Sequence, residues 1–411
     1  MKVLMLHNRY RERGGEDYSS AAEVELLRSV GIDCEFLQLD NREMIKTGLA
    51  AAAAAVWSRQ RANEIFDIVI DRKIDVVHVQ NFFPQFSPAV HWAAGEAGAA
   101  VVQTLRNYRL ACVNGQFFRD GRICEDCLGR TPIRGVIHRC YRDSIAASGA
   151  VAAMLVAHRL LGTWTHKVDR FIAVSDFIRT KLLQAGLPPG KVEVKPNFLP
   201  VEPAAPGPGD GGYFIYVGRL SEEKGIRTLL DAWKTLSPPA PVLKLVGEGP
   251  LEEFVRSAAA ALPQVEVLGP RKPAEVLDLV ARAQALVFPS EWYEGHPRVL
   301  IEALSVGTPI ISSDIGAAAE VVEDQVSGLQ FRGGVALDLS AKVKEFMTGR
   351  DRMRAMRSAA RETFLARYTA ASNVKRILGI YERALEHAAK VRLARSAKTQ
   401  DPRDLTPSRL T

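Results

Sequence analysis

Short apolar segments alternate with helix-like segments along almost the whole chain, and this alternation limits the fold more than any other feature. Strands that alternate with helices form parallel sheets, which the helices cover on both faces. The sequence therefore predicts an α/β protein with doubly wound sheets. The expected strands form two series, Val3–Leu6, Asp75–Val79, Ala100–Thr104, Arg170–Val174 and Val192–Val194, then Tyr213–Val217, Val242–Val246, Gln264–Leu268, Ala285–Phe288 and Pro309–Ser312.

A segment rich in Pro and Gly, residues 200–212, separates the two series of strands and predicts an interdomain linker. We expect an N-terminal domain at residues 1–199 and a C-terminal domain at residues 213–370. The 411 residues suffice for two domains that each bury a core. Two doubly wound domains joined in this way direct the carboxyl ends of their strands toward a shared cleft.

The stretch from Val287 to Glu302 combines features that suit a ligand with a phosphate and a polyol. An apolar strand leads into an acidic, Gly-containing turn, and Pro297 stands where a helix would place its first residue. The amides of Gly295 and His296 would then lie at a helix N-terminus, which favours an anion. Glu294 and Glu302 can accept hydrogen bonds from sugar hydroxyls. This combination predicts a nucleotide-sugar site.

Glu294 and Glu302, with seven residues between them, resemble the paired-glutamate motif of the retaining GT-B glycosyltransferases of family 4. The Glu-Gly-x-Pro turn and the small-residue helix that ends in Gly307-Thr308-Pro309 are part of the resemblance, which covers the chain to about Lys390. It implies a GT-B fold of two Rossmann-like domains and transfer of a sugar from a nucleoside diphosphate to a glycan, lipid-linked or small-molecule acceptor.

The loop after Tyr213–Val217 presents Arg219 and Lys224, and it resembles the segment of the family that grips the diphosphate. Fixed cations stabilise the charge that a leaving diphosphate gains, so catalysis would need neither a metal nor another cofactor. By analogy, Glu302 would bind the ribose, and Glu294 would hold the hydroxyls of the transferred hexose. The expected catalytic residues are therefore Arg219, Lys224 and Glu294.

Turns that follow other strands are expected to complete the donor site. Gly14 and Gly15 would let backbone amides approach the phosphates closely. The family resemblance places Gly247, Gly249 and Arg271 near the nucleoside. The expected donor-binding residues are Gly14, Gly15, Gly218, Gly247, Gly249, Arg271, Gly295, His296, Pro297 and Glu302.

The acceptor side carries two departures from the family pattern, at strand ends that should face the cleft. Gln80 and Arg106 stand where relatives often have histidines. An Arg cannot shuttle protons near neutral pH but can bind an anion, so the change predicts either a phosphorylated or carboxylated substrate or impaired activity. The candidate acceptor-side residues are His78, Asn81, Arg106 and Asn107, and a core role for His78 is equally compatible with the sequence.

Four of the five cysteines cluster at Cys112, Cys124, Cys127 and Cys140. The Cys-x-x-Cys pair with one Cys on either side allows a structural zinc site. The alternative is a set of reduced cysteines that pack under an acceptor-binding loop.

The C-terminal part of the chain is basic. Residues 341–411 hold 17 Lys and Arg against 7 Asp and Glu, a surplus of +10, so the remaining residues carry −3 of the total +7. This placement argues against a nucleic-acid channel and allows contact with an anionic membrane surface, although a solvated tail fits equally. Residues 373–389 are expected to form a helix that packs back on the N-terminal domain, and residues 391–411 a disordered tail.

The N-terminus lacks a signal-peptide cleavage pattern and reads as a first strand, which predicts a cytoplasmic protein, peripheral on the inner membrane face if the basic segment binds lipid. Two other classes remain open. A nucleotide-sugar 2-epimerase has the same architecture, and Arg106 also fits a non-catalytic nucleotide-sugar binder.

Overall fold

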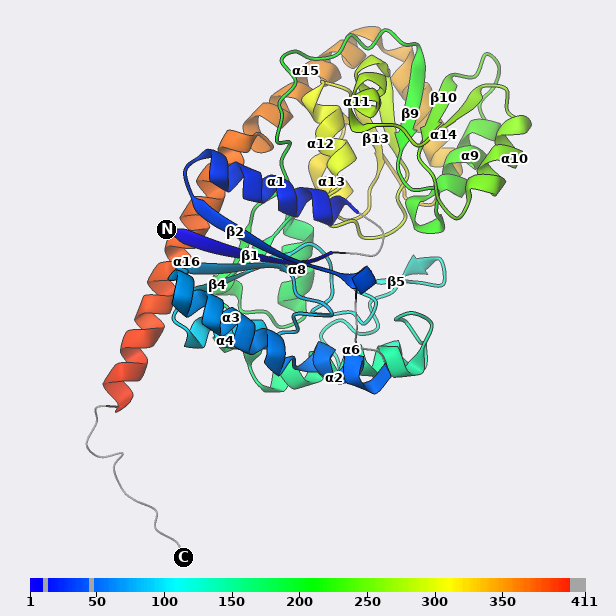
Figure 1. Ribbon diagram of the computed structural model, residues 1–411. Coiled ribbons are helices and arrows are strands. Elements are labelled where there is room, and N and C mark those ends of the chain that lie inside the picture. The colour runs from blue at the N-terminus through cyan, green and yellow to red at the C-terminus, as the bar shows by residue number, and fades with distance from the viewer. Residues whose placement is uncertain (10–13, 44–47, 400–411) are drawn as a thin grey trace, which may run out of the picture.

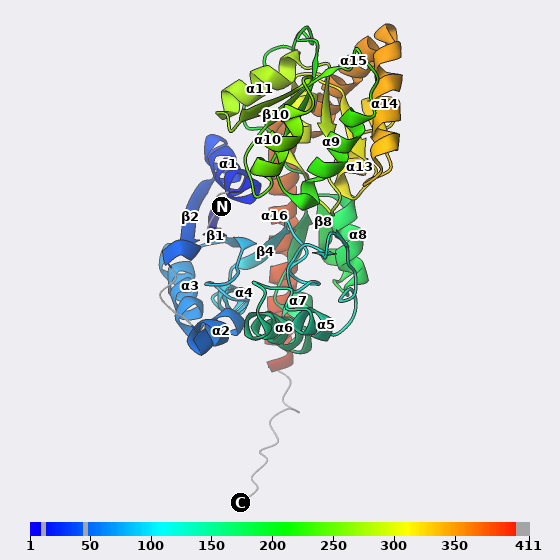
Figure 2. The same cartoon turned by 90° about the vertical axis from the view of Figure 1, so that its right-hand side faces the viewer.

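The computed structural model describes residues 1–9, 14–43 and 48–399 and has two α/β domains, one above the other (Figures 1 and 2). Each domain is built on a six-stranded sheet in which all paired strands are parallel. This is the doubly wound, two-domain GT-B architecture that the alternation of strands and helices predicts.

The N-terminal sheet has the strand order β2-β1-β3-β4-β7-β8. Its strands are β1 (Lys2–Arg9), β2 (Asp33–Asp40), β3 (Val76–Asn81), β4 (Ala100–Leu105), β7 (Arg170–Ala173) and β8 (Val192–Val194), and a small hairpin pairs β5 (Phe118–Arg119) with β6 (Arg122–Ile123). Its helices are α1 (Gly15–Ser29), α2 (Gly48–Val56), α3 (Arg59–Arg72), α4 (Ala89–Glu96), α5 (Ile133–Ile137), α6 (Ile145–Leu160), α7 (Thr163–His166) and α8 (Asp176–Gln184). Every residue of β3 and β4 is buried, because helices cover both faces of the sheet.

The C-terminal sheet has the order β11-β10-β9-β12-β13-β14. Its strands are β9 (Tyr213–Val217), β10 (Val242–Val246), β11 (Val265–Gly269), β12 (Ala285–Phe288), β13 (Ile310–Ser313) and β14 (Gly328–Phe331). Its helices are α9 (Ile226–Lys234), α10 (Glu252–Ala260), α11 (Pro273–Arg282), α12 (Arg298–Ser305), α13 (Ala317–Val321), α14 (Ala336–Thr348) and α15 (Arg350–Arg367). Separate apolar cores lie on the two faces of this sheet, and the loops after β9 and β12 both leave from its carboxyl edge.

The connection at residues 200–212 contains no helix or strand. It is nevertheless fixed to the C-terminal domain, because Arg357 of α15 donates to the carbonyl of Gly207 at 2.8 Å and Arg361 donates to that of Pro203 at 2.9 Å. Hydrogen bonds to backbone carbonyls therefore order a segment whose composition alone indicates only flexibility.

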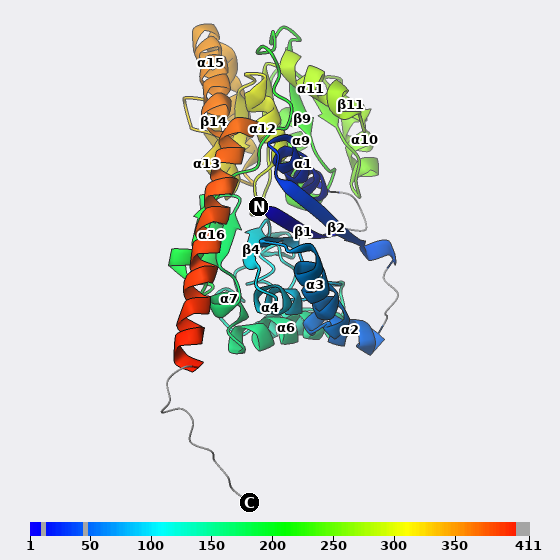
Figure 3. The ribbon, with the colours of Figure 1, turned by 60° about the vertical axis from the view of Figure 1, so that its left-hand side comes forward.

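The last helix, α16 (Ala370–Thr399), returns from the C-terminal domain and runs along the N-terminal domain (Figure 3). Ile377, Ile380 and Tyr381 pack in the same core as strands β1, β3 and β4. The predicted disorder from residue 391 is wrong for residues 391–399, which continue the helix, and residues 400–411 lie outside the described part of the chain.

Candidate functional site

A cavity of about 830 Å³ lies between the two domains, at the carboxyl ends of their strands. The N-terminal domain contributes the start of α1 and the loop after β4, and the C-terminal domain contributes the loops after β9 and β12. The residues predicted from sequence that line this cavity are Gly15, Arg106, Asn107, Gly218, Lys224, Arg271, Glu294, Gly295, His296, Pro297 and Glu302.

Two of the predicted catalytic residues, Lys224 and Glu294, form an ion pair. Their Nζ and Oε1 atoms are 2.5 Å apart, and Ser290 Oγ donates to the same carboxylate oxygen at 3.0 Å. Glu294 is only 7% exposed, whereas the Lys224 side chain is 22% exposed. A buried carboxylate with two fixed donors holds one geometry, which suits a group that must orient a ligand.

The turn before α12 is packed tightly against the other domain. The side chain of Asn197 donates to the carbonyl of His296 at 3.0 Å, and a Cβ atom on Gly295 would collide with the carbonyl oxygen of Arg106. Pro297 immediately precedes the helix instead of being its first residue, because α12 begins at Arg298. Only glycine fits at position 295, and the turn therefore joins the two domains at the cavity.

Burial shifts the pKa values of two ionisable side chains near α12. Burial lowers the pKa of His296 to about 3, so its imidazole is neutral, and its Nδ1 atom is buried without a hydrogen-bond partner. Burial also raises the pKa of Glu302, and its ion pair with Arg298 at 3.2 Å only partly offsets this effect. Arg298 also lies 5.6 Å from the ring of Tyr18, which reaches across from α1.

The predicted glycines divide into two groups. Gly15 and Gly218 line the cavity, and Gly14 immediately precedes α1. Gly247 and Gly249 do not line it: Cβ atoms there would collide with the carbonyl oxygens of Gly218 and Leu220. They allow the β10–α10 turn to pack against the loop after β9, and their contact with the nucleoside stays a prediction.

A second cavity of about 370 Å³ adjoins the first on the N-terminal side, and Arg106, Asn107 and Arg109 line both. Asn81 lines the second cavity, where its amide donates to the carbonyl of Asn8 at 2.8 Å. Arg219, predicted to grip the donor diphosphate with Lys224, lines this second cavity and not the first. The two cations of the loop therefore face different cavities.

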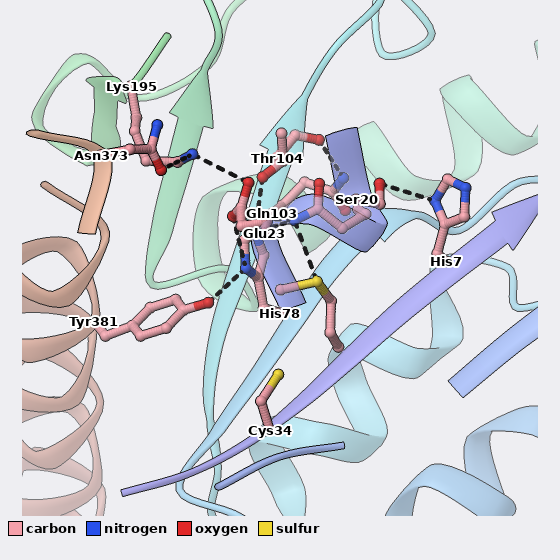
Figure 4. Close-up of polar contacts among 12 residues, drawn as sticks. His7, Ser20, Glu23, Cys34, His78, Gln103, Thr104, Lys195, Asn373 and Tyr381 are labelled. Atoms are coloured by element: carbon pink, nitrogen blue, oxygen red, sulfur yellow. Dashed lines mark hydrogen bonds and ion pairs between the residues drawn. The ribbon is translucent and has the colours of Figure 1, made fainter. Parts of the chain in front are cut away.

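A buried polar network lies behind the cavities and connects α1, β3, α16 and the segment that follows β8 (Figure 4). Glu23 Oε2 is 3.1 Å from Lys195 Nζ and 3.3 Å from Arg106 Nη2. Lys195 also donates to Asn373 Oδ1 at 3.2 Å. Burial opposes ionisation of Glu23, but the neighbouring charges, above all Lys195, outweigh it and lower its pKa to about 2.

His78 belongs to this network and lines neither cavity. Its Nδ1 atom is 2.7 Å from the hydroxyl of Tyr381 and its Nε2 atom is 2.7 Å from Thr104 Oγ1, and burial lowers its pKa to about 4. This imidazole is fully buried, as a core role requires, and its acceptor-side role stays a prediction.

The two departures from the family pattern contact each other. Arg106 donates from Nε at 3.1 Å and from Nη2 at 3.0 Å to Gln80 Oε1, and from Nη1 to Asn197. Gln80 in turn donates to Glu23 at 3.2 Å. The predicted role of Arg106 as an anion binder is not supported, because its guanidinium is engaged by the network.

The four cysteines of the zinc prediction, Cys112, Cys124, Cys127 and Cys140, line one small space of about 10 Å³. All are free thiols, and Cys112 donates to Asn114 Oδ1 at 2.9 Å. Burial raises the pKa of Cys127 to about 11. Within the described residues, no group of three or more His, Cys, Asp or Glu side chains is arranged to hold a metal ion, so zinc stays a prediction.

None of the helices in residues 1–9, 14–43 and 48–399 is long and apolar enough to span a bilayer.

Comparison with known proteins identifies both halves of the chain. Residues 15–197 match the glycosyl transferase 4-like domain, and residues 202–363 match the glycosyl transferases group 1. The phosphatidyl-myo-inositol mannosyltransferase of Mycobacterium leprae is 27% identical over 272 residues, which cover 64% of this chain and 70% of that protein.

A second relative and a solved structure agree with this assignment. The phosphatidylinositol N-acetylglucosaminyltransferase gpi3 subunit of Schizosaccharomyces pombe is 28% identical over 215 residues, so the match spans half of this chain and 47% of that protein. The crystal structure of Anabaena HepE in complex with UDP has a TM-score of 0.65 at 18% identity, covering 92% of this chain and 99% of that one. The chain belongs to the GT-B glycosyltransferases of family 4.

Proposed function

We propose that this transferase moves a hexose, with retention of anomeric configuration, from a nucleoside diphosphate sugar to a hydroxyl of a glycan, lipid-linked or small-molecule acceptor. The observation that carries the proposal is the Lys224–Glu294 pair at 2.5 Å in the wall of the interdomain cavity. The cation of this pair can bind the diphosphate of a nucleotide sugar, and the carboxylate can accept a hydrogen bond from a hydroxyl of its sugar.

The rest of the cavity supports the same ligand. Arg271, Pro273 and Val276 line it beside the end of β11 and would contact the nucleoside, and Glu302 would accept hydrogen bonds from the ribose. The backbone amides at the starts of α1 and α12 add partial positive charge for the phosphates. HepE, which has the same fold, was crystallised in complex with UDP, and this agrees with a nucleotide donor.

We propose that catalysis does not depend on a metal ion. As the bond between the sugar and the phosphate breaks, Lys224 and the helix N-termini would stabilise the charge that develops on the leaving diphosphate. Glu294 would keep the sugar oriented, and the acceptor hydroxyl would transfer its proton to the departing phosphate on the same face. His296 is neutral at physiological pH and therefore would not add a positive charge beside the leaving diphosphate.

Product analysis tests the proposal. Purified protein is incubated with uridine, guanosine and adenosine diphosphate sugars, with and without sugar acceptors, and products are identified by mass spectrometry and NMR. We expect acceptor-dependent release of nucleoside diphosphate and an α-linked product from an α-linked donor. Conversion of the donor sugar to its 2-epimer without acceptor would establish the isomerase, and tight donor binding without turnover would establish a non-catalytic binder.

We also propose polysaccharide biosynthesis as the process and peripheral contact with an anionic membrane through the basic C-terminal segment. Residues 341–411 carry a surplus of +10, and the sequence similarity to a putative colanic acid biosynthesis glycosyltransferase of Salmonella typhimurium fits this role. Co-sedimentation with phosphatidylglycerol vesicles at low and high salt tests the contact, because an electrostatic attraction must weaken as salt is added.

A further inference from the structure

The second cavity has an unusual charge composition. Four arginines, Arg106, Arg109, Arg142 and Arg219, are among its lining residues, and none of those lining residues is Asp or Glu. The Asn and Gln side chains of the lining can bind the hydroxyls of a sugar, whereas the arginines add donors and positive charge. The lining therefore suits a ligand that carries an anionic group as well as hydroxyls.

The arginines are not equivalent. Arg106 shares the carboxylate of Glu23 with Lys195, and its guanidinium is therefore already engaged in the buried network. For Arg109 and Arg142, in contrast, no carboxylate in the described part of the chain lies within ion-pair distance. Arg109 is partly buried and Arg142 is exposed. Two such cations at one concave site attract an anion, because a cleft lined by one sign of charge concentrates its field.

Aromatic stacking fixes Arg109 in the cavity. Its Cζ atom lies 4.9 Å from the centroid of the Phe83 ring and 5.1 Å from that of Tyr141. The Cζ atom of Arg142 lies 5.3 Å from the same Tyr141 ring. Stacked guanidinium groups lose little further freedom when they bind, and their planar edges match the oxygens of phosphate and carboxylate.

The second cavity lies next to the first, where the donor sugar would bind. Arg106, Asn107 and Arg109 line both cavities, so a ligand in the second cavity would lie beside a donor in the first. Arg219 closes the second cavity from the C-terminal domain. The site is therefore placed to receive an acceptor.

We propose that the second cavity binds the acceptor through an anionic group, a phosphate or a carboxylate, held by Arg109 and Arg142. The proposal rests on the proposed transfer function and specifies its acceptor class. The anion would anchor the acceptor while one of its hydroxyls points into the first cavity toward the donor sugar.

Calorimetric titration of the full chain tests the proposal. The donor cavity is first filled with whichever of uridine, guanosine or adenosine diphosphate raises the Tm most. Glucose 1-phosphate, glucuronate and the neutral methyl glucoside are then titrated. We expect one or both anionic sugars to bind at least about 10-fold more tightly than methyl glucoside. Binding of glucose 1-phosphate alone would identify a phosphate acceptor, and binding of glucuronate alone a carboxylate acceptor.

Two variants and a matched control test whether Arg109 and Arg142 bind the anionic sugar. Arg142→Gln should weaken binding of the anionic sugar about 10-fold, and Arg109→Lys should weaken it because the stacked planar fork is lost. Arg139→Gln is the control: Arg139 is exposed, lies three residues before Arg142, shares its positive φ (51° against 55°) and does not line the cavity. We expect this control to bind like the wild type.

Equal binding of methyl glucoside, absence of binding by all three sugars, or an unchanged affinity in Arg142→Gln would overturn the proposal. Failure of the transfer function would be seen separately, because then none of the three nucleotides would raise the Tm. In that case, glucose 1-phosphate titrated into Arg142→Gln and into Lys224→Ala still tests the arginines, because Arg142 lines the second cavity and not the first, whereas Lys224 lines the first and not the second.

Discussion

Replacing Glu23 with Gln should destabilise the protein strongly, because the change leaves two buried cations without their counterion. Glu23 lies 3.1 Å from Lys195 and 3.3 Å from Arg106, and the three side chains are at most 4% exposed. Removing one partner of a buried ion pair typically costs about 3–5 kcal/mol. The pKa gives a similar value: lowering it from 4.5 to about 2 corresponds to about 3 kcal/mol.

The pH dependence of this effect has a definite sign. Because the pKa of Glu23 is lower in the folded state, its stabilising contribution is complete above the unfolded value of 4.5 and is lost as pH falls toward about 2. The difference in unfolding free energy between wild type and Glu23→Gln should therefore be largest near neutral pH. It should shrink steadily below pH 4.5.

Urea titrations followed by circular dichroism, repeated from pH 7 to pH 3.5, measure this difference. Glu25→Gln is the matched control, because Glu25 is on the same helix and its side chain is 73% exposed, paired only with Arg28 at 3.2 Å. We expect the control to change stability by less than about 0.5 kcal/mol. A loss below about 1 kcal/mol in Glu23→Gln, or a loss that does not change with pH, would refute the reasoning.

Three further predictions concern the cavities. Lys224→Ala should lower turnover about 10²- to 10³-fold in a coupled assay of nucleoside diphosphate release while the protein remains folded, and near-normal turnover would remove the diphosphate role of Lys224. Glu294→Gln should lower turnover about 10- to 100-fold with little change in nucleoside diphosphate affinity, whereas Glu302→Gln should weaken that affinity; the reverse pattern would contradict the assigned roles. Chelation with EDTA should leave turnover unchanged, and a strict requirement for magnesium or manganese would contradict metal-independent catalysis.

Local sequence patterns predict the donor side of the site well. The strand, turn and helix around Glu294 and Glu302 are contiguous in sequence, so their geometry follows from neighbouring residues. Strand β2 (Asp33–Asp40) is missing from the prediction, because most of its residues are only partly buried at a sheet edge and the apolar pattern is weak. Residues 391–399 are polar and basic but contain good helix formers, and they extend a helix that packing has already nucleated.

Long-range pairings account for what the sequence does not predict. Glu23 and Lys195 are 172 positions apart, and His78 and Tyr381 are 303 apart. No periodicity or motif links such residues, because only the completed fold brings them together. A charged residue on the buried face of a helix, such as Glu23 beside Val24 and Leu27, is the one signal that could have indicated a buried charge.

A crystal structure of the protein with its preferred donor shows directly whether the interdomain cavity binds a nucleoside diphosphate sugar. We predict that the diphosphate lies within hydrogen-bond distance of Lys224. A hydroxyl of the sugar should donate a hydrogen bond to Glu294, and the ribose should donate one to Glu302. A donor bound outside this cavity, or one whose phosphates contact neither Lys224 nor the N-termini of α1 and α12, would contradict the account.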